Sequence, residues 1–137
     1  MIYYLSIIIP FYNSRKFIDK SIKNSLEISK KNPNTEIIYI NNNSNDGSGI
    51  ILKNKIKNIK NIKFFVTNKK DGMGPGVARN LGVKKANSDL IMFLNLIIVL
   101  YNYIPLQICL IQINQSKNDA LQDALHSSCS KQFHSLH

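Results

Sequence analysis

Four short polar segments hold most of the side chains in this 137-residue chain that could bind or transform a ligand. Between them they offer an aromatic ring, amides, hydroxyls, a carboxylate and a guanidinium, and they are Tyr12-Asn13, Asn41 to Ser48, Asp71 to Arg79, and Asn95. A tyrosine ring can stack on a nucleobase, and a guanidinium beside the free N–H groups of a helix start suits a phosphate. The same residue types are also common in turns. Taken alone, they leave a ligand site and a set of ordinary turns both open.

The elements that must position these segments are strands alternating with helices. The strands are short apolar runs, expected at Leu5 to Ile9, Glu36 to Ile40, Ile62 to Val66 and Leu90 to Leu94. The segments between them have helical periodicity, with caps expected at Ser14 for the first helix and at Asp46 or Ser48 for the second. A glycine-rich loop leads into the third helix. This alternation predicts an α/β fold with four parallel strands in one sheet and helices on both faces.

The predicted sheet brings the polar segments together, because each of them follows a strand and parallel strands end at the same edge. In open sheets of this kind, ligands bind outside the carboxyl ends of the strands. The pattern therefore predicts one site at that edge, with Tyr12, Asn42 and Arg79 lining one cleft.

The net charge and the cysteines bear on the partner and on the cellular compartment of the protein. A formal net charge of +10 would suit a polyanion such as nucleic acid, but the lysines are scattered, as in Lys53 to Lys63, and are not interleaved with aromatic residues. A solvated basic face is therefore favoured over a nucleic-acid partner. Cys109 and Cys129 form no CxxC pair and fit a reducing cytosol. The N-terminal ten residues read as a first strand and not as a signal peptide, so we expect a cytoplasmic protein.

Three motifs resemble the nucleotide-binding half of family 2 glycosyltransferases. Residues 6–13 read SIIIPFYN against the family's S-V-I-I-P-x-Y-N, residues 40–48 read INNNSNDGS against V-D-D-G-S-T-D-G-S, and residues 74–82 read GPGVARNLG against G-x-x-x-A-R-N-x-G. The resemblance covers residues 4 to about 95 and implies a Rossmann-like GT-A nucleotide-binding half. It identifies no catalytic residue. It implies nucleotide contacts from Pro10, Tyr12, Asn42, Ser44 and Arg79.

The chain departs from this family in two places. Asn41 and Asn42 replace two aspartates, and Asn42 stands where the family uses a carboxylate to accept the uracil N3–H. Its amide oxygen can still accept that bond, so a weakened contact is expected. Further along, Asn95 and Ile97 stand where the family's aspartates hold Mg²⁺ or Mn²⁺. Such cations need anionic oxygen ligands, so Asn95 is expected to be a degenerate metal position and the chain is expected to bind no metal.

The composition changes sharply after Asn95. Residues 1–89 hold 16 of the 18 basic residues, whereas residues 96–137 hold all five Gln, all three His and both Cys. We divide the chain into a partial glycosyltransferase domain, residues 1–95, and an irregular, unmatched tail, residues 96–137. The change favours a truncated or frame-shifted gene over a divergent C-terminal segment. The His and Cys residues of the tail lack the paired spacing of a zinc site.

A long uncharged stretch raises the question of a membrane. Leu96 to Ile113 is long enough to span a bilayer as a helix, but Pro105 and several amide side chains interrupt it. A peripheral contact with the inner membrane face is therefore favoured over a span.

The resemblance implies a transferase of polysaccharide biosynthesis. Such an enzyme moves a sugar from a nucleotide sugar, a UDP-sugar first of all, to a glycan or lipid-linked acceptor. The departures at Asn42 and Asn95 and the change in the tail lead us to expect that this chain is truncated and weakly active or inactive. Two alternatives stay open: a non-catalytic nucleotide-binding remnant and, less favoured, a basic nucleic-acid-binding module.

Overall fold

The computed structural model describes residues 2–96 and 109–112 of the chain. In chain order its elements are β1 (Leu5–Phe11), α1 (Ile18–Lys31), β2 (Thr35–Asn41), α2 (Ser48–Ile56), β3 (Ile62–Val66), the short 3₁₀ helix η1 (Lys69–Asp71), α3 (Pro75–Lys85), β4 (Leu90–Phe93) and β5 (Cys109–Gln112). The strands form one sheet in the order β3-β2-β1-β4-β5.

The first four strands run parallel, as predicted. β1 lies between β2 and β4 and pairs with both, while β3 extends the sheet beyond β2. The chain therefore builds outward from β1 on one side through β2 and β3, and then crosses to the other side of β1 to place β4. A change of direction of this kind leaves a crevice outside the carboxyl ends of the two strands where it occurs, here β1 and β4.

The fifth strand differs from the irregular tail expected from the sequence. β5 pairs antiparallel with β4, with Ile91 opposite Ile111. Without β5, β4 would be an edge strand with a row of unpaired N–H and C=O groups, and a short apolar run can supply the missing partner. A change in composition does not show such a pairing, because the pairing depends only on a few backbone groups meeting in space.

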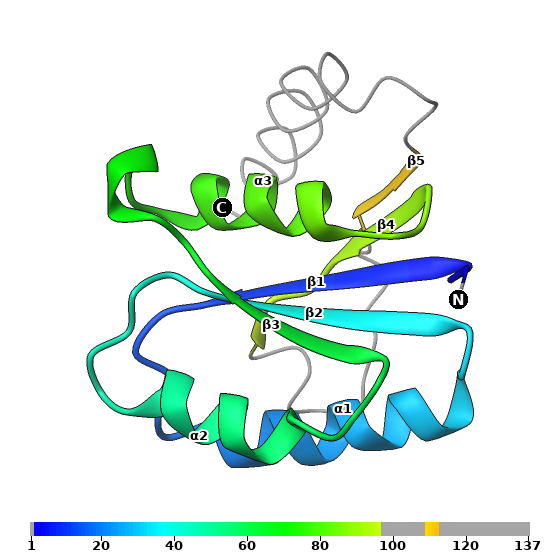
Figure 1. Cartoon of the computed structure of the whole chain (residues 1–137), viewed down its shortest axis with the longest axis horizontal. Coiled ribbons are helices and arrows are strands. Elements are labelled where there is room, and N and C mark those ends of the chain that lie inside the picture. The colour runs from blue at the N-terminus through cyan, green and yellow to red at the C-terminus, as the bar shows by residue number, and fades with distance from the viewer. Residues whose placement is uncertain (1, 97–108, 113–137) are drawn as a thin grey trace, which may run out of the picture.

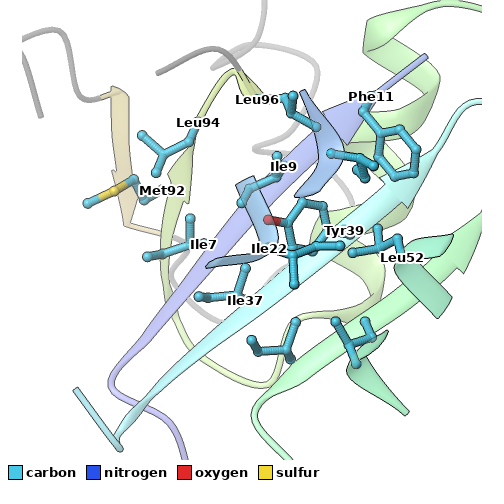
Figure 2. Packing of buried hydrophobic residues seen from close by; sticks show 13 residues of the cluster. Ile7, Ile9, Phe11, Ile22, Ile37, Tyr39, Leu52, Met92, Leu94 and Leu96 are labelled. Carbon is cyan, nitrogen blue, oxygen red and sulfur yellow. The ribbon is translucent and has the colours of Figure 1, made fainter. Parts of the chain in front are cut away.

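The helices cover the two faces of the sheet unequally: α1 and α2 lie on one face and α3 on the other (Figure 1). Alternate residues of β1 and β2 therefore enter separate cores. Ile7, Ile9 and Tyr39 belong to the larger cluster beneath α1 and α2, drawn in Figure 2, and Ile8 and Ile38 belong to the smaller cluster beneath α3. Burial on both faces explains why these strands appear in the sequence as continuous apolar runs.

The starts of α1 and α2 differ from the caps predicted from the sequence. Ser14 does not cap α1 with its side chain, because its hydroxyl donates to the carbonyl of Tyr12 at 3.1 Å. Instead the backbone carbonyl of Ser14 accepts from the N–H groups of Phe17 and Ile18, and α1 begins only at Ile18. For α2 the expectation of a cap at Asp46 or Ser48 is also wrong: Gly47 is the N-cap residue, Ser48 is the first residue of the helix, and the Asp46 carboxylate accepts from the Ser48 N–H at 3.0 Å.

Gly82 allows α3 to lie close to β1, and replacing it is expected to destabilise the fold. A Cβ at this position would lie 2.4 Å from Cγ2 of Ile8, whose side chain is fully buried. We expect Gly82→Ala to lower the free energy of unfolding by about 1–2 kcal/mol, the cost of overpacking less the gain in helix propensity. The control is Gly76→Ala in the same helix, where a Cβ would meet nothing within 4 Å. Urea unfolding of both variants measures the difference, and equal stabilities would contradict this close packing.

Candidate functional site

The loops after β1, β2 and β3 leave the sheet at one edge, the carboxyl edge (Figure 1). Phe11 of β1 is in register with Asn41 of β2, and the next N–H, that of Asn42, donates to the Phe11 carbonyl at 2.9 Å. Tyr12 and Asn42 thus follow directly from two paired strand ends. Two of the three residues predicted to share a site are neighbours in the backbone framework.

Hydrogen bonds join the β1–α1 loop to the β2–α2 loop. The N–H of Asn13 donates to Oγ of Ser44 at 3.0 Å, and Oδ1 of Asn13 accepts from the N–H of Asn45 at 2.9 Å. Asn13 makes both bonds from a left-handed backbone conformation, with φ at 45°. Asparagine adopts that conformation more readily than most residues. The two loops therefore form a single cross-linked surface, with Ser44 at the junction.

Asp46 strengthens the same junction. Its Oδ2 accepts from the backbone N–H of Arg15 at 2.8 Å, and its Oδ1 accepts from the hydroxyl of Ser48 at 2.6 Å as well as from the Ser48 N–H. Partial burial raises the pKa of Asp46, but the hydrogen bonds from Ser48 and Arg15 outweigh it and hold the pKa below its ordinary value. Asp46 is therefore ionised at neutral pH, beside the N-terminus of α2, where a negative charge is favourable.

Asn41 has a structural role in the loop. Its Oδ1 accepts from the N–H of Ser44 at 2.8 Å, which closes a tight turn. Its Nδ2 lies so close to α2 that a Cβ on Gly49 would sit 2.3 Å from it. Asn41 therefore fixes the shape of the β2–α2 loop and the approach of α2.

Thr67 is a site residue that the sequence analysis missed. It follows β3 directly and is 3% exposed. Its N–H donates to the Asn41 carbonyl at 3.0 Å, its hydroxyl donates to Oδ1 of Asn42 at 3.0 Å, and Asn43 contacts it in turn. The signal that could have found it is its place, because it is the first polar residue after a strand that ends at the predicted edge.

The predicted ligand-contacting residues of β1 differ in exposure. Tyr12 is 52% exposed, although the preceding Phe11 is 4% exposed and packs edge-on against Tyr39 in the core. Pro10 lies inside β1, in register with Ile40, and is partly buried. The ring of Tyr12 is therefore accessible to a ligand, whereas Pro10 contributes mainly to the strand that carries it.

Arg79 lies in α3, whose N-terminus faces the carboxyl edge (Figure 1). The helix begins at Pro75 after Gly74, a glycine with φ of 118° that few other residues could adopt. Arg79 is partly buried, and no described side chain forms an ion pair or hydrogen bond with its guanidinium. Its helix packs on the face opposite α1 and α2, and the described contacts do not join it to Tyr12 or Asn42. The single cleft expected from the sequence stays a prediction.

Comparison with known proteins decides the family. The family described as "Glycosyl transferase family 2" matches residues 6–96, which include β1 without its first residue and every element from α1 to β4. This chain belongs to glycosyltransferase family 2. An uncharacterized glycosyltransferase of Haemophilus influenzae is 38% identical over 91 residues, 66% of this chain and 35% of the relative. The poly(ribitol-phosphate) beta-N-acetylglucosaminyltransferase TarP of Staphylococcus aureus is 30% identical over 91 residues, 66% of this chain and 27% of the relative.

Solved glycosyltransferase structures share the fold. The TarS 1-349 structure of S. aureus in complex with UDP aligns with a TM-score of 0.55 at 25% identity, over 67% of this chain and 27% of that one. The mannosyltransferase PcManGT of Pyrobaculum calidifontis was solved in complex with GDP-Man and Mn²⁺. It aligns with a TM-score of 0.58 at 16% identity, over 70% of this chain and 28% of that one. The chain spans about a third or less of the length of the relatives and structures named here.

The residue predicted to stand at the family's metal position, Asn95, lies among the described residues. Asn95 follows β4 at the carboxyl edge, where the Leu94 N–H still donates to the Ile8 carbonyl at 3.0 Å, and it is exposed. Ile97, the second metal position expected from the motif, lies outside the described residues. Within residues 2–96 and 109–112, no group of three His, Cys, Asp or Glu side chains converges. A neutral amide does not fit Mn²⁺ or Mg²⁺ as a carboxylate would, so we derive no chemistry through a metal.

Proposed function

We propose that this chain binds a nucleotide sugar at the carboxyl edge of its sheet. The cross-linked pair of loops after β1 and β2 carries this proposal, because it holds an exposed aromatic ring beside fixed polar side chains at the paired ends of β1 and β2. Binding sites gain affinity when their groups need not be ordered by the ligand. Here the ordering is done by the loops themselves.

Four of the five predicted residues have a role in this proposal. Tyr12 stacks on the base, while Asn42 and Ser44 lie beside it in the cross-linked loops. Arg79 approaches the diphosphate from the first turns of α3. We propose a UDP-sugar as the donor, supported by TarS structures that were solved with UDP-GlcNAc and with UDP.

The sugar acceptor belongs to the whole protein. Relatives from Campylobacter jejuni and Methanococcus voltae carry names that specify lipid-linked substrates, a diphosphoundecaprenol and a dolichyl phosphate. We propose a glycan or lipid-linked acceptor here as well, reached from the cytoplasm. Within the described residues, no helix is long and apolar enough to cross a membrane. The neutral Asn95 at the metal position favours a chain that binds the nucleotide but transfers sugar weakly or not at all.

Titration calorimetry with UDP tests the binding site, and Arg79→Ala is the informative variant. We expect saturable binding to the full chain and a loss of about ten- to a hundredfold in the affinity of the variant, because a hydrogen bond between charged groups is worth about 1.5–3 kcal/mol. Arg15→Ala is the matched control. This variant removes the same charge at the same edge of the sheet. The Arg15 guanidinium, however, pairs with Asp19 at 3.6 Å, and the hydrogen bond from the Arg15 backbone N–H to Asp46 is kept in the variant. An equal loss in both variants would point to general electrostatics and against a phosphate contact.

The nucleic-acid alternative is tested with a duplex oligonucleotide at two salt concentrations. Binding through scattered lysines would weaken steeply with salt, because each neutralised phosphate releases counterions. Saturable UDP binding together with weak, non-saturating oligonucleotide binding is the result expected from the proposed function. Tight oligonucleotide binding without UDP binding would overturn it.

A further inference from the structure

Three polar side chains at the ends of β2 and β3 form a relay of hydrogen bonds. Nδ2 of Asn43 lies 3.1 Å from the backbone carbonyl of Thr67 and 2.9 Å from the Thr67 hydroxyl oxygen. That hydroxyl lies in turn 3.0 Å from Oδ1 of Asn42. Asn42 is 8% exposed and Thr67 is 3% exposed, so the relay is largely withdrawn from water.

The direction of the relay fixes which way the Asn42 amide faces. A backbone carbonyl can only accept, so the Asn43 atom beside it must be the NH₂ group. The same NH₂ group donates to the Thr67 hydroxyl, whose own proton is then available for one other partner. That partner is Asn42, so the atom of Asn42 that faces Thr67 is its oxygen. The reverse orientation would leave the buried hydroxyl proton without an acceptor, which is unfavourable.

The NH₂ group of Asn42 has no hydrogen-bond acceptor among the described residues. Among the described residues, every fully buried side-chain nitrogen or oxygen has a hydrogen-bond partner. A side-chain nitrogen without a partner is therefore not fully buried. The Asn42 nitrogen therefore reaches the surface, at the carboxyl edge where the proposed ligand binds.

We propose that Asn42 reads the nucleobase with an N–H donor, and that the site consequently accepts cytidine nucleotides about as well as uridine nucleotides. This inference rests on the proposed function. A carboxylate can only accept, so it suits the N3–H of uracil and opposes the N3 lone pair of cytosine. An amide whose oxygen is anchored on Thr67 can donate to cytosine N3 or to a uracil carbonyl. Thr67 is thus a positioning residue for base recognition.

The test compares the dissociation constants of UDP and CDP for the full chain at one ionic strength. We expect the two constants to agree within about threefold. We expect Asn42→Asp to favour UDP over CDP by at least about tenfold. The carboxylate has no N–H donor, and its oxygen lone pairs would face the lone pair of cytosine N3 and repel it. Thr67 can donate to the new carboxylate as it does to the amide, so the loop should keep its shape.

The matched control is Asn45→Asp. It adds the same charge to the same loop at an exposed residue, and the backbone N–H that binds Asn13 is retained. Both constants should weaken together in this variant, with their ratio unchanged. A ratio that shifts as far as in Asn42→Asp would overturn the inference, because the effect would then come from charge alone.

The wild-type measurement separates this inference from the function on which it rests. Binding of neither nucleotide at millimolar concentration would overturn both. A preference for UDP above about threefold in the unmodified chain would overturn only the inference, because a uridine-nucleotide site would still be present.

Discussion

The unmodified chain is expected to transfer no measurable sugar from a UDP-sugar in the presence of Mn²⁺. The family resemblance places a carboxylate at the position of Asn95, whose neutral amide follows β4 at the carboxyl edge. A divalent cation stabilises the charge that develops on the leaving diphosphate, and its loss costs on the order of 4 kcal/mol, or about a thousandfold in rate. Consumption of a radiolabelled UDP-sugar measures this. Robust transfer by the unmodified chain would contradict the assignment of Asn95 as a degenerate position.

The same reasoning predicts how nucleotide binding responds to metal. UDP affinity of the unmodified chain should change little with Mn²⁺. The double variant Asn95→Asp with Ile97→Asp should bind UDP more tightly in Mn²⁺ and no more tightly without it, because only a carboxylate draws the cation to the diphosphate. Asn58→Asp is the control, since it adds a charge at an exposed residue beyond the far end of α2. If Mn²⁺ also raised the UDP affinity of Asn58→Asp, the effect of the metal would reflect net charge and not a carboxylate at residues 95 and 97.

Replacing Glu36 is expected to cause a large loss of stability, about 3 kcal/mol for Glu36→Ala. Glu36 is fully buried near the start of β2. It therefore lies at the amino ends of the strands, opposite the candidate site. Its carboxylate accepts from Ser6 Oγ at 2.5 Å, and from Lys63 Nζ and the Asn87 N–H at 2.6 Å each. Removing it leaves a partly buried ammonium and two further donors without their acceptor. Urea unfolding measures the loss.

The carboxylate of Glu36 also makes stability depend on pH in a defined direction. Burial raises its pKa, but the hydrogen bonds from Lys63, Ser6 and Asn87 outweigh it, and the pKa lies below its ordinary value of 4.5. Its contribution is therefore complete above about pH 4.5 and is lost as the pH falls through the lower folded pKa. Glu36→Gln should lose less stability than Glu36→Ala and should flatten this acid dependence.

A surface ion pair provides the control for Glu36. Nζ of Lys55 lies 2.6 Å from Oδ1 of Asp19, but both side chains are more than half exposed. Solvent screens such pairs, so Asp19→Asn should barely shift the urea midpoint. A similar shift for Asp19→Asn and Glu36→Ala would mean that burial of the carboxylate is not what makes Glu36 important.

Part of the site could be predicted from the sequence because strand direction alone decides it. Tyr12 and Asn42 end two apolar runs, and parallel strands place such ends side by side, as the Phe11–Asn41 register confirms. Arg79 could be assigned to the start of a helix at the same edge, but not to a distance from the other two. That distance depends on how far α3 lies from the sheet, which Gly82 and Ile8 set by contact.

The sequence by itself determined the alternation of strands and helices, the parallel sheet and the edge that carries the candidate site, because periodicity and turn residues act over a few neighbouring positions. Only the tertiary structure decided the pairing of β5 with β4, the relay from Asn43 through Thr67 to Asn42, and the burial of Glu36. These features join residues that are far apart in the chain, as Glu36 and Asn87 are by 51 positions. Their energies come from hydrogen bonds that exist only once separate elements meet, and no local pattern in the sequence encodes them.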